Sequence, residues 1–404
     1  MGGLVLHSPS DQLLFAISAA LDLTYKGISP HHMRVALVTG KISQALGLPR
    51  ERLQCAVRAA LIHDCGVKTW GERDKLHVFE VEHPFQHAED GFRLLEPSPL
   101  CALAVVVRYH HDRWSGGNLS GLAGESIPLE SRILHLADRL DVLLDPARFY
   151  NCQRSEVLKA LEGYRGSAFD PQLVDVLGDI GRQESFWLDL EPEFLRDSLA
   201  GFMAATPKPA SQRETYGSIP ELGEIEGVAE VFAGIVDRRS PYTYQHSKRV
   251  ADCAYRLGKV LGFDENRCRE LRVAGLLHDL GKLGVDEGIL DKNGSLDGAE
   301  VCVIRRHPYL TFRLLERVSG FEELKEWAAF HHERLDGKGY PFGFGEDRLS
   351  LEARVVAVCD VFAALSEDRP YRRGLERDKV MEILEKMADS GALDRKVVEA
   401  AGCL

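Results

Sequence analysis

The chain has 404 residues and is acidic, because 50 lysines and arginines stand against 62 aspartates and glutamates, for a net charge of −12. A general duplex-DNA binder needs a basic face, so this balance disfavours DNA as a partner, whereas a small phosphate ligand needs only a few arginines and metal ions. The length exceeds that of one ordinary domain, and a hydrophobic content of 45% is enough to form buried cores.

The N-terminal segment lacks the basic stretch and apolar core of a signal peptide, and no run of about 18 apolar residues could cross a membrane. The nine cysteines occur singly, without a CxxC pair, as is typical of reduced thiols in the cytoplasm. We therefore expect a cytoplasmic protein that does not bind membranes.

Apolar residues recur at helical spacing along most of the chain, and residues 31–48 are the first clear example. We therefore predict an all-α fold. Residue types that bind metals follow in the first half, beginning with a histidine at the start of this segment. This first set is His31, His63, Asp64, His87, His110, His111 and Asp138.

Residues 205–222 have a different composition, rich in proline, serine and threonine, with two prolines in three residues and no periodicity. Such a segment is typical of a linker. We predict one domain over residues 1–204, this linker, and a second domain over residues 223–404.

Residues 246–263 repeat the pattern of residues 31–48, with an arginine, a valine and a Leu-Gly pair at matching positions. The interval between the first histidine and the following His-Asp pair is 32 residues in both copies, since 63 − 31 equals 278 − 246. The second set of metal-binding residue types is His246, His278, Asp279, His307, His331, His332 and Asp360.

Two later segments of the first half, HAEDGFRLL and SRILHLADRL, match HPYLTFRLL and ARVVAVCDVF of the second half. The first match pairs His87, rather than His83, with His307. The second match pairs Asp138 with Asp360. An ordered match of this length indicates an internal repeat, and therefore two related helical bundles.

The composition of each set points to more than one metal ion. Five histidines and two aspartates exceed the four ligands of a structural zinc site, and they suit two six-coordinate ions about 3.5–4 Å apart. Imidazole suits Fe, Mn, Zn or Ni, and carboxylate extends the choice to harder ions such as Mg. Two such ions lower the pKa of a water and polarise a phosphoryl oxygen, which is the chemistry of phosphodiester hydrolysis. A single histidine is usually a core or surface residue, but seven ligand types in matched order in two copies indicate metal binding.

Three motifs of the second half, HDLGK at 278–282, HHERLDGKGYP at 331–341 and DVFAALSEDRPYR at 360–372, resemble the HD-GYP phosphodiesterases, a branch of the HD superfamily. The resemblance covers about residues 224–390, and the first half resembles a degenerate HD or HD-GYP domain. It implies a helical domain that hydrolyses cyclic di-GMP or, in tandem-HD members, cyclic GMP-AMP. The expected product is a linear dinucleotide, with a second cut to mononucleotides as a further step.

The resemblance also implies roles for individual residues. The second set would supply the metal ligands, with Asp279 bridging two ions, for which Fe or Mn is favoured and Mg, Ni and Zn are alternatives. Asp279 and Lys282 would be catalytic, with Lys282 directed at the scissile phosphate. Arg369 and Arg372 would bind phosphates through their guanidinium groups. The wall of the substrate pocket would be formed by Gly339, Tyr340 and Pro341.

The second half departs from the family at two positions. Members with three metals carry a glutamate four residues before the first histidine, where this chain has Tyr242 in the second copy and Gly27 in the first. We therefore predict two ions. Many members carry an aspartate three residues after the last metal aspartate, where this chain has Ala363 in the second copy and Asp141 in the first. Loss of such a supporting carboxylate would weaken or retune the metal site.

The first half keeps the ligands but lacks the groups that bind substrate. Val67 replaces the lysine, and WSGGN at 114–118 replaces LDGKG, with no Gly-Tyr-Pro after it. The first set is therefore a candidate second metal site that is structural, regulatory or vestigial. A bundle with residual ligands that forms a homodimer is an equally good interpretation.

Two other functions fit parts of the pattern. A non-catalytic module that binds a cyclic dinucleotide, a diguanylate cyclase or another signalling protein would explain Ala363 and the incomplete first copy, but not the retained Lys282. A general HD phosphohydrolase acting on nucleotides would explain the ligands, but not the Gly-Tyr-Pro motif. The sequence leaves the choice between guanine and adenine open.

Overall fold

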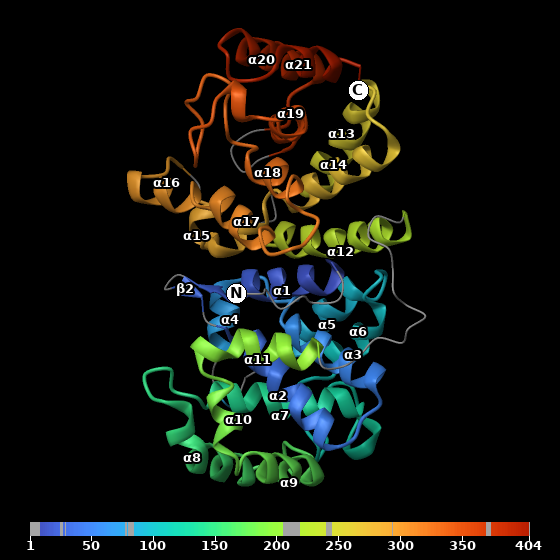
Figure 1. Ribbon diagram of the computed structural model, residues 1–404, viewed down its shortest axis with the longest axis vertical. Helices are drawn as coiled ribbons and strands as arrows, with labels where there is room; N and C mark the ends of the chain where they lie inside the picture. The colour runs from blue at the N-terminus through green and yellow to red at the C-terminus, as the bar shows by residue number, and fades with distance from the viewer. Residues whose placement is uncertain are drawn as a thin grey trace. The chain divides into compact units, whose positions relative to one another are not determined.

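In the computed structural model the regular secondary structure is almost entirely α-helical, which confirms the predicted all-α class (Figure 1). The chain divides into two compact units, residues 1–213 and 214–404. The residues that the structure describes are 9–24, 27–28, 30–76, 79, 85–204, 219–239, 245–292, 294–368 and 373–403. Four residues named above, His83, Tyr242, Arg369 and Arg372, lie outside them.

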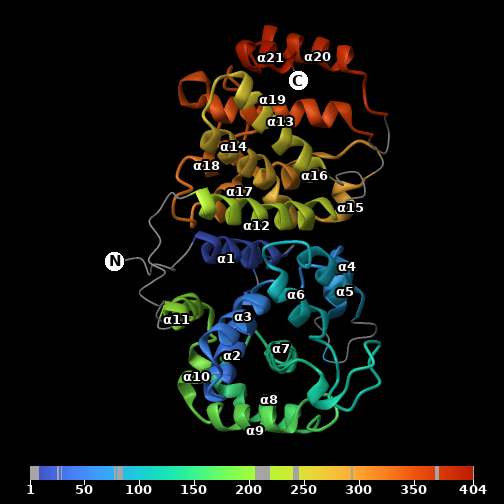
Figure 2. The same cartoon turned by 90° about the vertical axis from the view of Figure 1, so that its right-hand side faces the viewer.

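The first unit is a bundle whose central helix is α2, which contacts α1, α3, α7, α9 and α11 (Figure 2). A short antiparallel pair, β1 and β2, joins α1 to α2 without changing the fold class. The elements are α1 (Pro9–Leu21), β1 (Leu23–Thr24), β2 (Gly27–Ile28), α2 (His31–Ala45), α3 (Arg50–Leu61), α4 (Trp70–Leu76), α5 (Phe85–Leu95), α6 (Cys101–Arg108), η1 (Gly124–Ser126), α7 (Leu129–Val142), α8 (Tyr150–Glu162), α9 (Pro171–Ile180), α10 (Glu184–Leu188) and α11 (Pro192–Ala204).

The second unit repeats this arrangement around α13, which contacts α14 and α19 and lies beside both in Figures 1 and 2. Helices α13, α14, α17, α18 and α19 correspond to α2, α3, α5, α6 and α7. The elements are α12 (Ile219–Asp237), α13 (His246–Val260), α14 (Glu265–Leu277), η3 (Leu280–Gly284), α15 (Glu287–Leu290), α16 (Gly298–Ile304), α17 (His307–Leu315), α18 (Leu324–Ala329), η4 (Glu346–Arg348), α19 (Leu351–Ser366), α20 (Arg377–Asp389) and α21 (Arg395–Ala401).

The division between the units falls inside the segment predicted as a linker. The end of that segment differs from the prediction, because α12 begins at Ile219 rather than after residue 222. Pro220 is compatible with the first turn of a helix, where a backbone N–H has no partner within the helix. Val228 and Phe232 of α12 are fully buried at helical spacing, so packing stabilises the helix.

The repeated Leu-Gly pair ends the first long helix in each copy. Gly47 and Gly262 have positive φ angles of 68° and 84°, which residues with a side chain rarely adopt. The residue after each glycine donates its N–H to a carbonyl five residues earlier, at 3.1 Å in the first copy and 3.0 Å in the second. This is the Schellman arrangement, and it ends α2 and α13 at equivalent positions.

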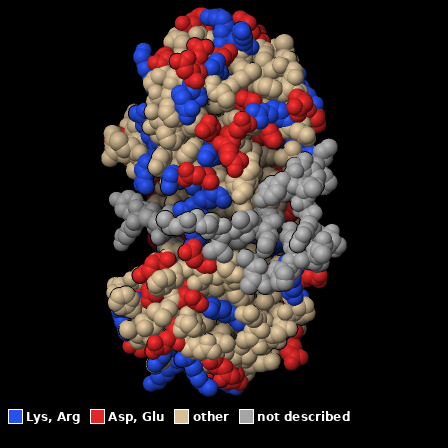
Figure 3. Space-filling model, in the orientation of Figure 1, with Lys and Arg blue, Asp and Glu red and all other residues tan. Residues whose placement is uncertain are grey.

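The surface agrees with the acidic, mixed composition. On the face shown in Figure 3, the described lysines and arginines alternate with aspartates and glutamates, without a continuous basic stripe. Among the described helices, none has the length and apolar character needed to cross a membrane.

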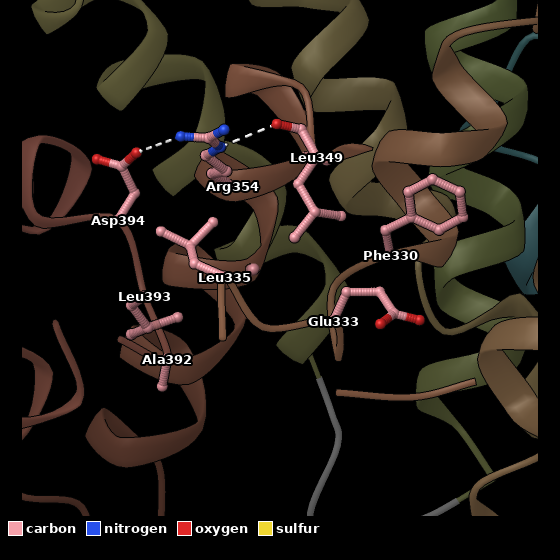
Figure 4. A pocket seen from close by; sticks show the side chains of 10 residues that line it. Phe330, Glu333, Leu335, Leu349, Arg354, Ala392, Leu393 and Asp394 are labelled. Carbon is pink, nitrogen blue, oxygen red and sulfur yellow. Dashed lines mark hydrogen bonds and ion pairs between the residues drawn. The ribbon is translucent and has the colours of Figure 1, made fainter. Parts of the chain in front are cut away.

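Hydrogen bonds hold the loop that follows α18 against α19 and against the segment before α21, where the N–H of Asp336 donates to the carbonyl of Gly391 at 2.9 Å. Arg354 of α19 donates hydrogen bonds to Asp394 at 2.8 Å and to the carbonyl of Leu349 at 2.9 Å (Figure 4). Asp394 also caps α21 by accepting from a backbone N–H. Phe330 and Glu333 line a small cavity beside this ion pair, with room for about one water molecule. The loop after α18 is therefore anchored to α19.

Candidate metal centres

The second set of ligand residues comes together in one place, which we call the second cluster. Six of its seven residues lie at or near the end of a helix, and Asp360 lies within α19. All are buried except the ring of His332, whose side chain is 30% exposed. The second cluster consists of His246, His278, Asp279, His307, His331, His332 and Asp360.

Asp279 lies at the centre of the second cluster, and its two oxygens face different histidines. Oδ1 is 3.4 Å from Nε2 of His307 and 3.9 Å from Nε2 of His331. Oδ2 is 3.2 Å from Nε2 of His278 and 4.0 Å from Nε2 of His246. Two ligand atoms that are each about 2.1 Å from one ion lie about 3 Å apart at right angles and about 4 Å apart on opposite sides, so each Asp279 oxygen and the histidines that it faces would be able to hold one ion.

Asp360, which lies within α19, is the last member of the second cluster. Its Oδ1 is 3.2 Å from Nε2 of His246 and 3.8 Å from Nε2 of His278, and its Oδ2 is 4.0 Å from Nδ1 of His332. Within the described residues, Oδ1 of Asp279 is buried without a hydrogen-bond partner. A buried carboxylate oxygen without a partner is costly, so the donor set fits bound cations.

The inner histidines are held with Nε2 directed into the second cluster. Nδ1 of His278, His307 and His331 each donates to the carbonyl of the third residue before it, at 2.8, 2.8 and 2.7 Å. These bonds fix the tautomer and the ring orientation. Burial lowers the pKa of His307 to about 3 and that of His331 well below its usual range, so both rings are neutral at pH 7. Neutral imidazole is the form that binds metals.

Asp279 is ionised in the same surroundings. Burial by itself raises the pKa of a carboxyl group, but His278 and Lys282 lower the pKa of Asp279 well below its usual range. Lys282 reaches this carboxylate directly, with Nζ 2.5 Å from Oδ2, and its side chain is 20% exposed. A positive charge therefore lies at a partly exposed edge of the second cluster.

The Gly-Tyr-Pro motif contacts the second cluster through its tyrosine. The ring of Tyr340 stacks on the ring of His332, with centroids 4.8 Å apart, and the guanidinium of Arg305 lies 4.3 Å from the Tyr340 centroid. Gly339 is needed for space, because a Cβ there would lie 2.4 Å from Cα of Glu333. Glu333 accepts N–H groups from two later residues of the loop at 2.7 and 3.0 Å. Glycine and glutamate thus shape the loop that places the tyrosine.

Two positioning residues were missed by the sequence reasoning. A Cβ at Gly281 would lie 2.0 Å from the backbone oxygen of His307, so only glycine allows α17 to approach the His-Asp pair this closely. The N–H of Gly281 donates to Oγ1 of Thr311 at 2.9 Å, and that hydroxyl donates to the carbonyl of His278 at 3.0 Å. The glycine two residues after the aspartate recurs as Gly66, and this repetition was the signal that could have identified it.

The first set of residues also comes together, in what we call the first cluster. Its members are His31, His63, Asp64, His87, His110, His111 and Asp138, all buried. Oδ1 of Asp64 is 3.5 Å from Nε2 of His63, 3.4 Å from Nε2 of His87 and 4.0 Å from Nε2 of His110. His87 therefore lies beside Asp64 as His307 lies beside Asp279.

The first cluster is more enclosed than the second. Arg139 is 3% exposed and donates to Oδ2 of Asp138 from Nε at 3.1 Å and from Nη2 at 2.6 Å. A valine occupies the equivalent position of the second copy, Val361. The ring of His111 is buried, whereas its counterpart His332 is partly exposed. The first cluster can hold ions but offers little surface to a substrate.

A further histidine, His32, also points at the first cluster. Its Nδ1 lies 2.6 Å from Oδ1 of Asp22, and its Nε2 lies 3.9 Å from Oδ2 of Asp64. Among the described residues, that Nε2 has no hydrogen-bond partner. The second copy has Ser247 at this position. The first cluster therefore has an additional ligand-type group that the second lacks.

Comparison with known proteins agrees with this duplicated arrangement. A model described as HD domain matches residues 29–143, and a second model described as HD domain matches residues 230–397. The 3'3'-cGAMP-specific phosphodiesterase 1 of Vibrio cholerae is 33% identical over 399 residues, which cover 96% of this chain and 90% of that protein. The cyclic di-GMP phosphodiesterase of Pseudomonas aeruginosa is 40% identical over 163 residues, which cover 39% of this chain and 38% of that protein.

A solved structure has the same architecture over nearly the whole chain. It is a crystal structure of a cyclic GMP-AMP specific phosphodiesterase of V. cholerae, with a TM-score of 0.62 and 26% sequence identity. The similarity covers 98% of this chain and 97% of that one. Both HD bundles therefore have counterparts in one protein.

Proposed function

The chain belongs to the HD-domain phosphodiesterases that cleave cyclic dinucleotides, and we propose that hydrolysis takes place at the second cluster, with 3'3'-cGAMP as the preferred substrate. The proposed preference for 3'3'-cGAMP rests on two relatives that are similar to nearly the whole chain and whose names specify cyclic GMP-AMP as the substrate. The relative named for cyclic di-GMP matches a much shorter segment.

One observation supports the choice of the second cluster: both its neighbouring cation, Lys282, and one of its ligands, His332, are partly exposed to solvent. Lys282 is partly exposed and contacts Asp279, whereas the first cluster has the buried Val67 at the matching position. The ring of His332 is reachable from solvent. A phosphate can therefore approach the second cluster and meet a positive charge there.

The residues of the second cluster and four further residues of this domain have different proposed roles in the reaction. Its histidines and aspartates would hold two divalent ions, with Fe or Mn favoured, and such ions activate a water and polarise a phosphoryl oxygen. Lys282 would stabilise the negative charge that develops on the phosphoryl oxygens. Arg369 and Arg372, which lie outside the described residues, are proposed to bind the flanking phosphates. Tyr340 keeps the ring of His332 in place through stacking.

The test is turnover by the full chain loaded with Mn or Fe. Equal concentrations of 3'3'-cGAMP and cyclic di-GMP are incubated with it, and linear dinucleotides are separated by chromatography. We expect faster loss of 3'3'-cGAMP, and loss of both activities in Asp279→Asn. Asp264→Asn is the matched control, because Asp264 caps α14 and asparagine caps helices equally well. Binding of either dinucleotide without turnover would instead favour a non-catalytic module.

We propose a second, non-catalytic role for the first cluster, as a structural metal centre. The supporting observations are its complete ligand set, its burial and the cover that Arg139 places on Asp138. Asp64→Asn is expected to lower the metal content of the purified chain, measured by elemental analysis. Equal metal content in this variant and the wild type would make the first cluster vestigial.

A further inference from the structure

The first histidine of each cluster directs its Nδ1 at a buried carboxylate, but the two carboxylates come from different sequence positions. Nδ1 of His31 is 2.7 Å from Oδ2 of Asp141, three residues after the last metal aspartate of the first copy. Nδ1 of His246 is 3.0 Å from Oε2 of Glu367, seven residues after the last metal aspartate of the second copy. The position that matches Asp141 is Ala363, whose side chain has no polar atom.

Helix geometry explains how the later residue reaches the same histidine. Positions three and seven residues along a helix lie on the same face, about one turn or 6 Å apart along the axis. Side chains of a helix tilt towards its N-terminus, so a residue at the end of α19 points back to the earlier turn. Glu367 is the C-cap of α19, its N–H donates to the carbonyl of Ala363 at 3.1 Å, and its side chain is one methylene longer than that of aspartate.

An arginine accompanies the carboxylate in both copies. Arg34 and Arg249 each lie three residues after the first histidine of their cluster. Arg34 donates to both oxygens of Asp141, from Nη2 to Oδ2 at 3.2 Å and from Nε to Oδ1. Nη1 of Arg249 is 3.3 Å from Oε1 of Glu367. The same order of histidine, carboxylate and arginine is therefore built twice from non-equivalent carboxylates.

Both carboxylates are removed from solvent. Asp141 is 5% exposed and Glu367 is 4% exposed. A buried carboxylate with an acceptor oxygen on Nδ1 fixes the ring orientation of a metal-binding histidine and increases the basicity of its Nε2. Nε2 of His246 is the atom that faces Asp360 and Asp279.

We propose that Glu367 is the positioning residue for His246 in the second cluster, and that it performs the task of the aspartate missing at Ala363. The proposal rests on the proposed metal centre, but not on the identity of the substrate. Ala363 then does not weaken the metal site, because Glu367, one turn later along α19, supplies the carboxylate that contacts His246. Loss of the Glu367 carboxylate would loosen His246 and lower the affinity for metal.

The test measures metal affinity, with activity as a second readout. All variants carry Asp64→Asn, so that the second cluster dominates binding, and Mn is titrated in competition with a chelator. We expect Glu367→Gln to raise the dissociation constant for Mn by about 10–100-fold, the range seen when such supporting groups are removed. Glu367→Asp, which keeps the charge but is one methylene shorter, should be affected less. It also serves if the glutamine variant does not fold.

The decisive variant places the carboxylate of the second copy at position 363, which is equivalent to Asp141 of the first copy. Ala363→Asp combined with Glu367→Gln should recover Mn affinity to within a few-fold of the parent, because the new aspartate would contact His246 as Asp141 contacts His31. Glu352→Gln is the matched control, because Glu352 is a buried carboxylate of α19 that contacts Arg267. Its Mn affinity should stay unchanged.

Three outcomes overturn the proposal. They are unchanged Mn affinity in folded Glu367→Gln, an equal loss in Glu352→Gln, and no recovery in a double variant whose helical circular dichroism is intact. Failure of the proposed function is seen separately. A parent chain that binds Mn but cleaves neither cyclic dinucleotide would contradict the function, while the affinity series would still decide the role of Glu367.

Discussion

Gly281→Ala tests whether the close approach of α17 to the His-Asp pair sets the geometry of the second cluster. The new Cβ would lie 2.0 Å from the backbone oxygen of His307, where ordinary contact begins at 3.4 Å. The two segments must therefore separate by about 1.4 Å. His307 Nε2 and Asp279 Oδ1 are 3.4 Å apart and are proposed to share an ion. A metal–ligand distance tolerates a change of about 0.2 Å, so a separation of about 1.4 Å is far too large for both groups to keep that ion.

The expected cost follows from this displacement. A misplacement of about 1 Å in an active site lowers the rate by about 100-fold, which corresponds to about 2.7 kcal/mol. Overpacking should also lower the free energy of unfolding by about 1–3 kcal/mol. The assay combines kcat/KM for 3'3'-cGAMP, elemental analysis for bound metal, and thermal unfolding to show that the variant is folded at the assay temperature.

The matched control is Gly298→Ala at the start of α16, where a Cβ would meet no atom within 4 Å. Its activity and metal content should equal those of the wild type. Gly66→Ala makes the same clash in the first copy, 2.0 Å from the backbone oxygen of His87, and should lower metal retention by the first cluster. A folded Gly281→Ala variant with full metal content and kcat/KM within threefold of the wild type would refute the reasoning.

Three further predictions concern the edge of the second cluster and its metals. Lys282→Met should lower kcat by about 100–1000-fold and leave the metal content unchanged, because the lysine is proposed to stabilise charge rather than hold ions. Loss of metal from this variant would instead show that the contact between Lys282 and Asp279 supports the metal site. Tyr340→Phe keeps the ring on His332 and should stay within threefold of the wild type, whereas Tyr340→Ala removes a stacking contact of about 0.5–1.5 kcal/mol and should lower activity by up to about tenfold; equal activity of the two variants would exclude a role for stacking. Removal of metals with a chelator should lower the midpoint of thermal unfolding, because ions bound to the folded state alone at 100 times their dissociation constant add about 2.7 kcal/mol per site. Re-addition of Mn should restore the midpoint, and an unchanged midpoint in both steps would count against metal binding.

The sequence by itself determined the repeated design of this protein. The helical periodicity, the 32-residue interval and the matched Leu-Gly pair are local features, and each depends on residues near one another in the chain. The candidate metal ligands could be predicted from the sequence, because His278 and Asp279 are adjacent in the chain and the other ligands recur in the same order in both copies. The same matching of segments predicted His87, rather than His83, as the counterpart of His307.

The tertiary structure decided which cluster is open and how each is supported. Ala363 suggested a weakened site, because the sequence cannot show that Glu367, one turn later, reaches the ring of His246. The cover that Arg139 places over the first cluster depends on the packing of α7 against residues more than 60 positions away in the chain, such as Leu76. Such contacts between distant residues are set by side-chain direction and burial, which periodicity and spacing along the chain do not encode.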